Sequence, residues 1–353
     1  MAYHIMQVGL GDFGRRWLKL VHAHPSWEYA GIATRNARVR AEFGREVRVA
    51  QKHQAATLRE LLDEQIDADA LLVTTPHFCH VDDVALGLAR GLNVLVEKPL
   101  AGSWSECLAI REAARAASGT LMVGENYRFG EGARLAREIV ASGEIGRPEF
   151  LSMDYFVGHS FPKGDWRNDY AYPVLIENAT HQFDLVRSVS GLNALEVFCT
   201  AFQSARTPHW SFPSVSAHFV MEDGFHFQFA ASWSYDELRT PWEGIWRLYG
   251  SEGALSWSQD RVEIHRGGEC RAVDVPSRPS DHTLEATLEE FTAALGAKRA
   301  AETDIEDNMQ TAAMVFGAIR SSEQRVAVSI PSMLAESSQA AARAEVVPGV
   351  AHP

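Results

Sequence analysis

A glycine-rich turn near the start of the chain constrains the fold more than any other feature. Residues 5–8 form a short apolar run, three glycines follow with the spacing G-x-G-x-x-G, and apolar residues then recur at helical spacing. A strand, a glycine turn and a helix in this order are typical of a dinucleotide-binding site, because glycine lets backbone N–H groups approach a pyrophosphate at the positive end of the helix. The residues expected to contact a cofactor here are Gly9, Gly11, Asp12, Phe13 and Gly14.

The end of the second expected strand, residues 28–34, bears on the choice between NAD and NADP. An NAD site usually carries an Asp or Glu about 20 residues after the glycine motif, where the carboxylate binds the ribose hydroxyls. Here the strand ends in Thr34, Arg35 and Asn36, without a carboxylate. The Arg35 guanidinium can pair with a 2′-phosphate or stack on adenine, and Thr34 can donate a hydroxyl hydrogen bond. We therefore predict that NADP(H) is preferred and that NAD(H) is the alternative cofactor.

Strand and helix patterns alternate through the first 125 residues. Apolar runs at 70–74 and 92–96 are separated by a helical pattern at 81–90, and a helical pattern at 104–117 precedes another run. This alternation predicts a doubly wound parallel sheet, in which ligands bind beyond the carboxyl ends of the strands. Glu97 and Lys98 directly follow one such end, so both are expected at the cofactor.

Beyond about residue 129 the pattern changes to strands with few helices between them. Asp223-Gly224 has the composition of a hairpin turn, a helical pattern runs over 176–191, and two more lie at 282–300 and 307–324. The sequence predicts an α/β protein with an N-terminal Rossmann domain over 1–125. It predicts an α+β domain with a large, mostly antiparallel open sheet over 126–335, and a C-terminal helix and tail over 336–353.

Composition excludes several classes of function. A formal net charge of −13 argues against a nucleic-acid partner, because a phosphate backbone needs clustered Lys and Arg. The four cysteines are scattered without paired spacing, which is typical of a reducing compartment and gives no zinc signature, so no metal is expected. No apolar run reaches membrane-spanning length and no leader precedes the first strand, so we expect a cytoplasmic protein without a membrane partner.

Five stretches together resemble the Gfo/Idh/MocA oxidoreductases, named for glucose–fructose oxidoreductase and inositol dehydrogenase. The resemblance covers nearly the whole chain and rests on residues 9–14, on Thr75-Pro76 with His80, on 97–100, on 126–129 and on 181–184. It implies nicotinamide-dependent oxidation or reduction at a sugar or cyclitol carbon, and an open sheet that often mediates oligomers. It adds these residues to the expected cofactor contacts: Thr74, Thr75, Pro76, His80 and Asn126.

The resemblance also implies a catalytic pair, which maps to Lys98 and His181. Many members carry an Asp four residues before that His, whereas this chain has Glu177, which is one methylene longer. One helical turn separates positions 177 and 181, so both could face one site, where Glu177 would reach a different substrate hydroxyl or hold Lys98.

The chemistry of alcohol oxidation favours the same pair. The reaction removes a hydride from carbon and a proton from oxygen; His titrates near neutral pH, and a Lys can stabilise negative charge that develops on the oxygen. Taken alone, His181 could be an ordinary helix histidine and Lys98 a surface partner of Glu97. The place of Lys98 at a strand end beside the expected cofactor favours catalysis.

The polar, aromatic loop at residues 161–173 is typical of sugar-binding sites. The predicted substrate contacts are Lys98, Asn126, Trp166, Arg167, Asn168, Glu177 and His181, whereas Arg128 and Asp184 are expected to be structural. We predict an NAD(P)-dependent dehydrogenase or reductase that acts on a polyhydroxylated small molecule. We also predict a homo-dimer or tetramer, because an open sheet face that carries aromatic side chains is seldom left exposed to solvent. Two alternatives stay open: a glycoside-cleaving enzyme that uses transient oxidation by a retained NAD, and a non-catalytic, cofactor-sensing regulator.

Overall fold

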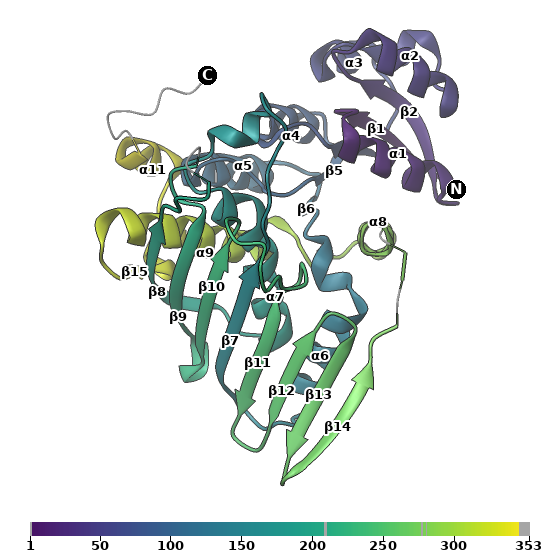
Figure 1. Cartoon of the computed structure of the whole chain (residues 1–353). Coiled ribbons are helices and arrows are strands. Elements are labelled where there is room, and N and C mark those ends of the chain that lie inside the picture. The colour runs from purple at the N-terminus through teal and green to yellow at the C-terminus, as the bar shows by residue number, and fades with distance from the viewer. Residues whose placement is uncertain (1, 208–209, 277, 280, 346–353) are drawn as a thin grey trace. The chain divides into compact units, whose positions relative to one another are not determined.

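The computed structural model describes residues 2–207, 210–276, 278–279 and 281–345 (Figure 1). The chain divides into two compact units, one made of residues 1–125, 281–309 and 336–353 and the other of residues 126–280 and 310–335. The first break follows Glu125, but the units are not contiguous in sequence, because residues 281–309 return to the first unit.

The first unit contains a six-stranded parallel sheet in the order β3-β2-β1-β4-β5-β6. Its strands are β1 (Tyr3–Val8), β2 (Trp27–Ala33), β3 (Gln54–Ala55), β4 (Ala70–Val73), β5 (Asn93–Val96) and β6 (Leu121–Val123). Its helices are α1 (Asp12–Ala23), α2 (Ala37–Glu46), α3 (Leu58–Asp63), α4 (His80–Ala89), α5 (Trp104–Ala116), α8 (His282–Ala297) and α11 (Ser338–Glu345). Strand β4 is buried along its whole length, as expected for a strand covered on both faces. The predicted doubly wound parallel sheet is confirmed.

Helix α8 returns to the first unit because its apolar side chains pack against β2. The rings of Trp27 and Phe291 stack with centroids 5.8 Å apart, and the Trp27 indole N–H donates to the Thr292 hydroxyl at 2.8 Å. After the helix, the Thr303 hydroxyl donates to the carbonyl of Val123 at 2.6 Å. Nothing in the local pattern of 282–300 specifies which sheet the helix covers, so the contiguous division expected from the sequence missed this return.

The second unit contains a nine-stranded sheet in the order β14-β13-β12-β11-β7-β10-β9-β8-β15. The strands are β7 (Pro148–Phe156), β8 (Ala194–Phe202), β9 (Ser214–Met221), β10 (His226–Ser232), β11 (Ile245–Gly250), β12 (Ala254–Ser258), β13 (Arg261–Arg266), β14 (Glu269–Asp274) and β15 (Val328–Ser329). Only β7 and β10 pair in parallel among these strands, so the predicted mostly antiparallel sheet is confirmed. Asp223 and Gly224, with φ of +54° and +73°, make the predicted turn between β9 and β10.

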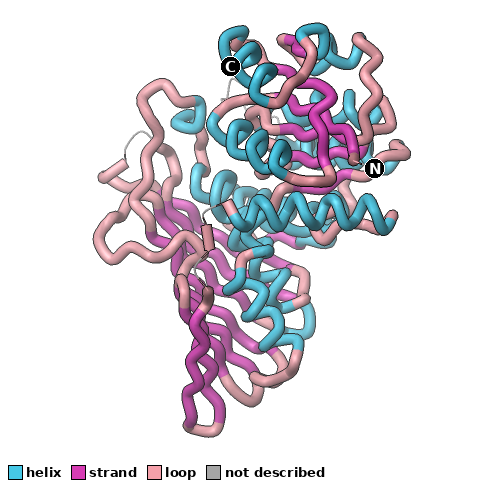
Figure 2. Tube along the Cα trace, turned by 90° about the vertical axis from the view of Figure 1, so that its right-hand side faces the viewer, coloured by secondary structure: helices cyan, strands magenta, loops and turns pink. Residues whose placement is uncertain are grey.

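Helices cover one face of this sheet (Figure 2). They are α6 (Glu131–Ala141), α7 (Thr180–Ser190), α9 (Ile305–Gln324) and α10 (Ile330–Leu334). On the covered face, Phe183 of α7 packs edge-on against Phe219 and Phe229 with centroids 4.9 and 5.2 Å apart. The opposite face carries partly exposed aromatics, including the tilted pair Phe150 and Tyr249 with centroids 6.4 Å apart.

None of the helices that the structure describes is both long enough and apolar enough to cross a bilayer. The predicted C-terminal helix is present as α11, and the tail expected after it, residues 346–353, lies outside the described residues.

Candidate active site

The glycine turn between β1 and α1 has the shape that a pyrophosphate requires. Gly9 has a φ of +89°, and a Cβ built on it would lie 2.6 Å from the backbone of Thr74 and Thr75. A Cβ on Gly14 would lie 2.2 Å from the Gly9 carbonyl oxygen, so both glycines are required by close packing. A Cβ on Gly11 meets nothing within 4 Å, and Gly11 precedes α1 without a capping side chain. The turn therefore leaves open space at a helix N-terminus, where an anionic cofactor group fits.

A buried glutamine, which the motif did not point to, holds this turn in place. The Gln7 side-chain amide donates to the Gly14 carbonyl at 2.9 Å and to the Thr74 hydroxyl at 3.1 Å, and it accepts the Tyr29 phenol at 2.6 Å. The Thr74 hydroxyl in turn donates to the Gly9 carbonyl at 2.5 Å. Thr74, predicted as a cofactor contact, thus uses its side chain to brace the turn.

The segment after β2 places the Arg35 side chain in solvent. Asn36 caps α2 by accepting from two backbone N–H groups, and Arg40 donates to the Thr34 carbonyl at 2.6 Å. Arg35 is exposed, and within the described part of the chain it forms neither a hydrogen bond nor an ion pair. Burial raises the pKa of the Cys79 thiol and the charge of Asp83 adds to this, whereas Arg35 lowers it.

The loop after β4 is tied to the segment after β5 through His80. The imidazole is buried, with one ring nitrogen 3.1 Å from the carbonyl oxygen of Leu100 and the other 2.8 Å from that of Thr75. The Thr75 hydroxyl donates to Asp83 at 2.8 Å. These bonds join two strand ends of the first unit, at the edge where a parallel sheet binds its ligand.

Glu97 is a buried anchor and not a surface residue. Its carboxylate accepts the Trp17 indole N–H, and its other oxygen accepts the backbone N–H of Lys98 at 3.1 Å. Burial raises the pKa of Glu97 to about 7, although the bonds from Trp17 and Lys98 favour the charged form. The Lys98–Pro99 peptide bond is cis, and the Lys98 side chain is partly exposed.

In the second unit, His181 is held between α7 and the short helix η3 (Asn126–Phe129). Its imidazole stacks on the Tyr127 ring with centroids 3.9 Å apart and planes 2° from parallel. Next to Tyr127, Arg128 forms a buried, bidentate ion pair with Asp184 of α7, including one bond of 2.8 Å. This agrees with the expected structural role of Arg128 and Asp184.

The helix that carries Glu177 differs from the regular one expected. Residues Val174–Ala179 form a π-helical segment, η5, before α7 begins, so positions 177 and 181 are not related by one regular α-helical turn. The Tyr170 phenol donates to Glu177 at 2.9 Å, and burial followed by the Glu177 charge raises the pKa of Tyr170. Such π-helical turns often occur at functional sites.

A hydrogen-bonded chain supports this segment from the sheet below. The Tyr155 phenol donates to Asn178 at 3.0 Å, the Asn178 amide donates to Gln182 at 3.0 Å, and the Gln182 amide donates to the Trp242 carbonyl at 2.9 Å. Of these residues, only Gln182 lies in one of the motif stretches, residues 181–184, and its sequence context does not indicate this bonding.

The predicted substrate loop is ordered by its own contacts. Arg167 binds Asp165 through two bonds of 2.9 and 2.7 Å and lies over the Phe161 ring, 4.0 Å from its centroid. The Asn168 amide donates to the Pro162 carbonyl at 2.9 Å. Trp166 meets Tyr170 edge-on with centroids 5.7 Å apart, so Tyr170 contacts both Trp166 and Glu177.

No sequence motif points to His159, which lies among aromatic side chains of the second unit. Its ring packs against Phe161, Trp233 and Trp242 with centroids 4.7, 4.8 and 5.7 Å apart. Burial lowers the pKa of His159, and the charge of Arg167 lowers it further. The only signal in the sequence is the density of aromatic residues in these segments.

The predicted residues therefore form two groups. The cofactor residues from Gly9 to Lys98 belong to the first unit, whereas Asn126, the loop at 166–168, Glu177 and His181 belong to the second. Within the second unit the structure joins the loop to Glu177 through Tyr170.

Two family models match the chain. One, described as an oxidoreductase family with an NAD-binding Rossmann fold, matches residues 3–125, and the GFO/IDH/MocA C-terminal domain matches residues 133–256.

Known proteins resemble the chain over different lengths. An uncharacterized protein of Sinorhizobium fredii is 25% identical over 346 residues, which are 91% of this chain and 94% of that protein. The 1-carboxy-3-chloro-3,4-dihydroxycyclohexa-1,5-diene dehydrogenase of Comamonas testosteroni is 30% identical over 141 residues, 39% and 36% of the two chains. Levoglucosan dehydrogenase in complex with NADH has the same fold, with a TM-score of 0.83 at 18% identity over 94% of this chain and 100% of that one.

Proposed function

Because the chain belongs to the Gfo/Idh/MocA family of NAD-binding oxidoreductases, we propose that it transfers a hydride between nicotinamide and a secondary alcohol or ketone carbon of a sugar, cyclitol or related polyol. Lys98 and His181 handle the proton in this reaction.

The buried anchor under Lys98 carries the proposal. Trp17 lies on α1, the helix that begins at the glycine turn, and its indole binds the carboxylate of Glu97. The same carboxylate accepts the backbone N–H of Lys98. The backbone at Lys98 is thus linked to the helix that is expected to bind the pyrophosphate. A lysine that was only solvated would not need its backbone held by a buried carboxylate.

Each residue has a distinct part in the chemistry. When bound, the nicotinamide cofactor would supply the hydride-transfer chemistry. The Lys98 ammonium donates a hydrogen bond to the reacting oxygen and stabilises negative charge there. His181 accepts the hydroxyl proton during oxidation and returns it during reduction, with its ring held by Tyr127.

We assign the cofactor preference to NADP(H). The exposed Arg35 follows β2, the position from which a side chain contacts the adenosine ribose. A carboxylate is absent there, and a guanidinium can bind a 2′-phosphate through two parallel hydrogen bonds.

The substrate is a polyhydroxylated ring. Trp166 and Tyr170 offer flat apolar surfaces for such a ring, and Glu177 offers a carboxylate that accepts hydroxyl protons. The two named relatives are dehydrogenases of a dihydroxylated cyclohexadiene and of levoglucosan, which supports a substrate of this class.

The exposed face of the nine-stranded sheet supports a homo-oligomer. Four aromatic side chains on this face are each between 37% and 49% exposed: Phe150, Phe198, Phe202 and Tyr249. Exposed apolar surface of this extent often marks a protein–protein interface. We propose a dimer or tetramer, and a monomeric mass by light scattering at working concentration would contradict it.

A substrate panel tests the proposed function. Sugars, cyclitols and their keto forms are incubated with NAD or NADP, and the nicotinamide absorbance is followed. We expect cofactor-dependent turnover of at least one cyclic polyol, and turnover slowed by roughly 100-fold or more in the Lys98→Ala variant. Cleavage of a glycoside with no net change in absorbance, by protein that retains its cofactor after purification, would instead support the glycoside-cleaving alternative.

A further inference from the structure

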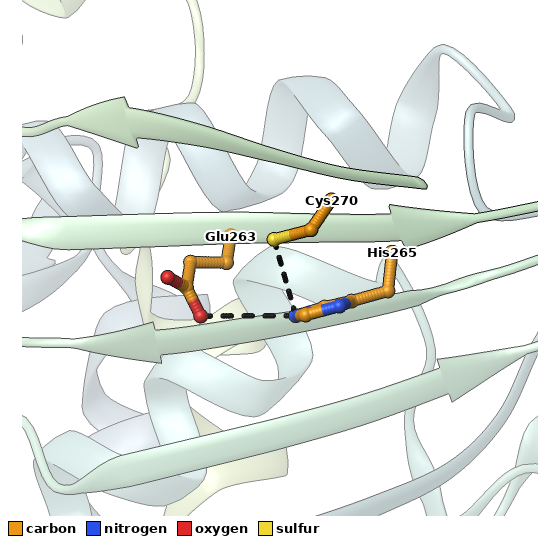
Figure 3. A group of neighbouring side chains, drawn as sticks. All are labelled: Glu263, His265 and Cys270. Atoms are coloured by element: carbon orange, nitrogen blue, oxygen red, sulfur yellow. Dashed lines mark hydrogen bonds and ion pairs between the residues drawn. The ribbon is translucent and has the colours of Figure 1, made fainter. Parts of the chain in front are cut away.

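Three side chains that commonly bind metals lie together on the β13–β14 hairpin, on residues that the proposed oxidoreductase reaction does not use (Figure 3). They are Glu263 and His265 of β13 and Cys270 of β14. We propose that they form a binding site for one divalent transition-metal ion of the zinc class.

The hairpin register brings the three residues to one face. Gly267 and Gly268, with φ of +60° and +85°, make the tight turn, and His265 lies directly opposite Cys270. Glu263 is two residues before His265 on the same strand, so its side chain points to the same side of the sheet. Figure 3 shows the carboxylate and the thiol approaching the imidazole from two directions.

The distances between the ligand atoms suit a metal. Cys270 Sγ lies 3.9 Å from His265 Nε2, which lies 3.7 Å from Glu263 Oε2, and all three atoms are within 4.8 Å of one another. A tetrahedral zinc with bonds of about 2.3 Å to sulfur and about 2.1 Å to nitrogen and oxygen separates its ligands by roughly 3.4–3.6 Å. Small side-chain rotations therefore close the site, and water completes the fourth position.

Arg261 orients the carboxylate for this role. Its guanidinium donates to Glu263 Oε1 at 2.8 Å, and Oε2, which also accepts the Ser256 hydroxyl at 3.5 Å, lies toward His265. A second residue that fixes a ligand's orientation is a regular feature of metal sites.

The ligand set selects the class of metal. Thiolate and imidazole bind zinc and cobalt(II) well, whereas magnesium and calcium take oxygen ligands. Coordination replaces the Cys270 thiol proton, which passes to solvent. Spacing between cysteines could not reveal this site, because its ligands are of three types and meet only through the hairpin register.

Cobalt(II) titration of the full chain under reducing, metal-free conditions tests the site. We expect one cobalt per chain and thiolate-to-cobalt charge-transfer absorption that zinc abolishes by displacement. Cys270→Ser should remove this absorption, and His265→Gln should weaken binding more than about 100-fold, because even outer residues of metal sites contribute 10–100-fold. Arg261→Ala should weaken it by roughly tenfold on the same basis.

Cys79→Ser is the matched control, because Cys79 is a partly exposed thiol of the first unit. It should bind cobalt as the unsubstituted chain does, and circular dichroism checks that each variant is folded. The proposal is wrong if the unsubstituted chain shows no charge-transfer absorption, if Cys270→Ser retains it, or if Cys79→Ser loses it. These outcomes are independent of dehydrogenase activity.

Discussion

The imidazole of His181 and the phenol ring of Tyr127 lie face to face, with centroids 3.9 Å apart and planes 2° from parallel. The neighbouring Arg128–Asp184 ion pair ties η3 to α7, the two elements that carry these rings. A stacked neighbour fixes the plane of the imidazole while leaving its nitrogens at the ring edge, which suits a residue that moves a proton.

This stacking predicts that the Tyr127 ring matters more than its hydroxyl. Tyr127→Ala should lower kcat by up to about tenfold, because a stacked aromatic pair contributes about 0.5–1.5 kcal/mol to orientation. Tyr127→Phe keeps the ring and should stay within about twofold of the unsubstituted enzyme. Steady-state kinetics across pH provide the measurement. An equal fall in kcat in both variants would show that the hydroxyl of Tyr127, and not its ring, supports catalysis.

Arg35 should set the cofactor preference. Arg35→Ala should weaken NADP binding by roughly 10–100-fold, because hydrogen bonds to charged groups contribute about 1.5–3 kcal/mol, and NAD binding should change little. Thr34→Asp should shift the preference towards NAD by placing a carboxylate where the phosphate would lie. Arg38→Ala, which removes an exposed cation on α2, is the control for general charge effects. Equal losses for both cofactors in a binding titration would rule out this role for Arg35.

Glu97 should make stability fall as the pH rises from about 4.5 to about 7. Its pKa in the folded chain is raised from 4.5 to about 7, so over this range the folded chain holds a proton that the unfolded chain has lost. Stability from this group is therefore fully present below about pH 4.5 and is lost as the pH rises to about 7, by about 3 kcal/mol in all. Glu97→Gln cannot ionise, so its free energy of unfolding should not show this fall.

Urea unfolding of both proteins at several pH values measures the difference. The free energy of unfolding of Glu97→Gln, relative to that of the unsubstituted chain, should rise between pH 4.5 and 7.5. Parallel pH dependences would mean that Glu97 is not a buried, proton-retaining carboxyl.

Breaking the buried ion pair should be costly for the second unit. The side chains of Arg128 and Asp184 are 5% and 1% exposed, so Asp184→Ala leaves a buried cation without its main partner and should cost about 3–5 kcal/mol of stability. The exposed pair Arg115–Glu306 provides the comparison, and Arg115→Ala should cost no more than about 1 kcal/mol. If urea unfolding gives a similar loss in the free energy of unfolding for both variants, the buried ion pair does not stabilise the second unit more than an exposed pair stabilises the first.

The parts of the fold that sequence could predict are those written in local patterns. The turn at Gly9 and the alternation of strands and helices up to residue 125 depend on neighbours in sequence, and both are present. No local pattern predicts strand β14, because nearly all of its residues are exposed and so show no alternation of buried and exposed positions. The return of α8 depends on Trp27 meeting Phe291, more than 260 residues away, and no local pattern records such a contact.

The same distinction applies to the candidate site. Lys98 and His181 were recognised because they belong to motifs, whereas Gln7 and His159 act through contacts that only the folded chain assembles. Helical spacing also could not distinguish the π-helical segment around Glu177 from a regular helix, because both place apolar residues on the buried side.

The role of Lys98 is the central claim, and single-turnover hydride transfer by Lys98→Ala tests it most directly. Cofactor titration of the same variant separates binding from chemistry, and His181→Ala and the double variant complete the set. We predict nearly unchanged cofactor affinity, a rate lowered by roughly 100-fold or more in each single variant, and a double variant little slower than either, because residues that act as a unit are not additive. Hydride transfer by Lys98→Ala at close to the unsubstituted rate would contradict the account and leave Glu97 and Lys98 as a structural link between β5 and α1.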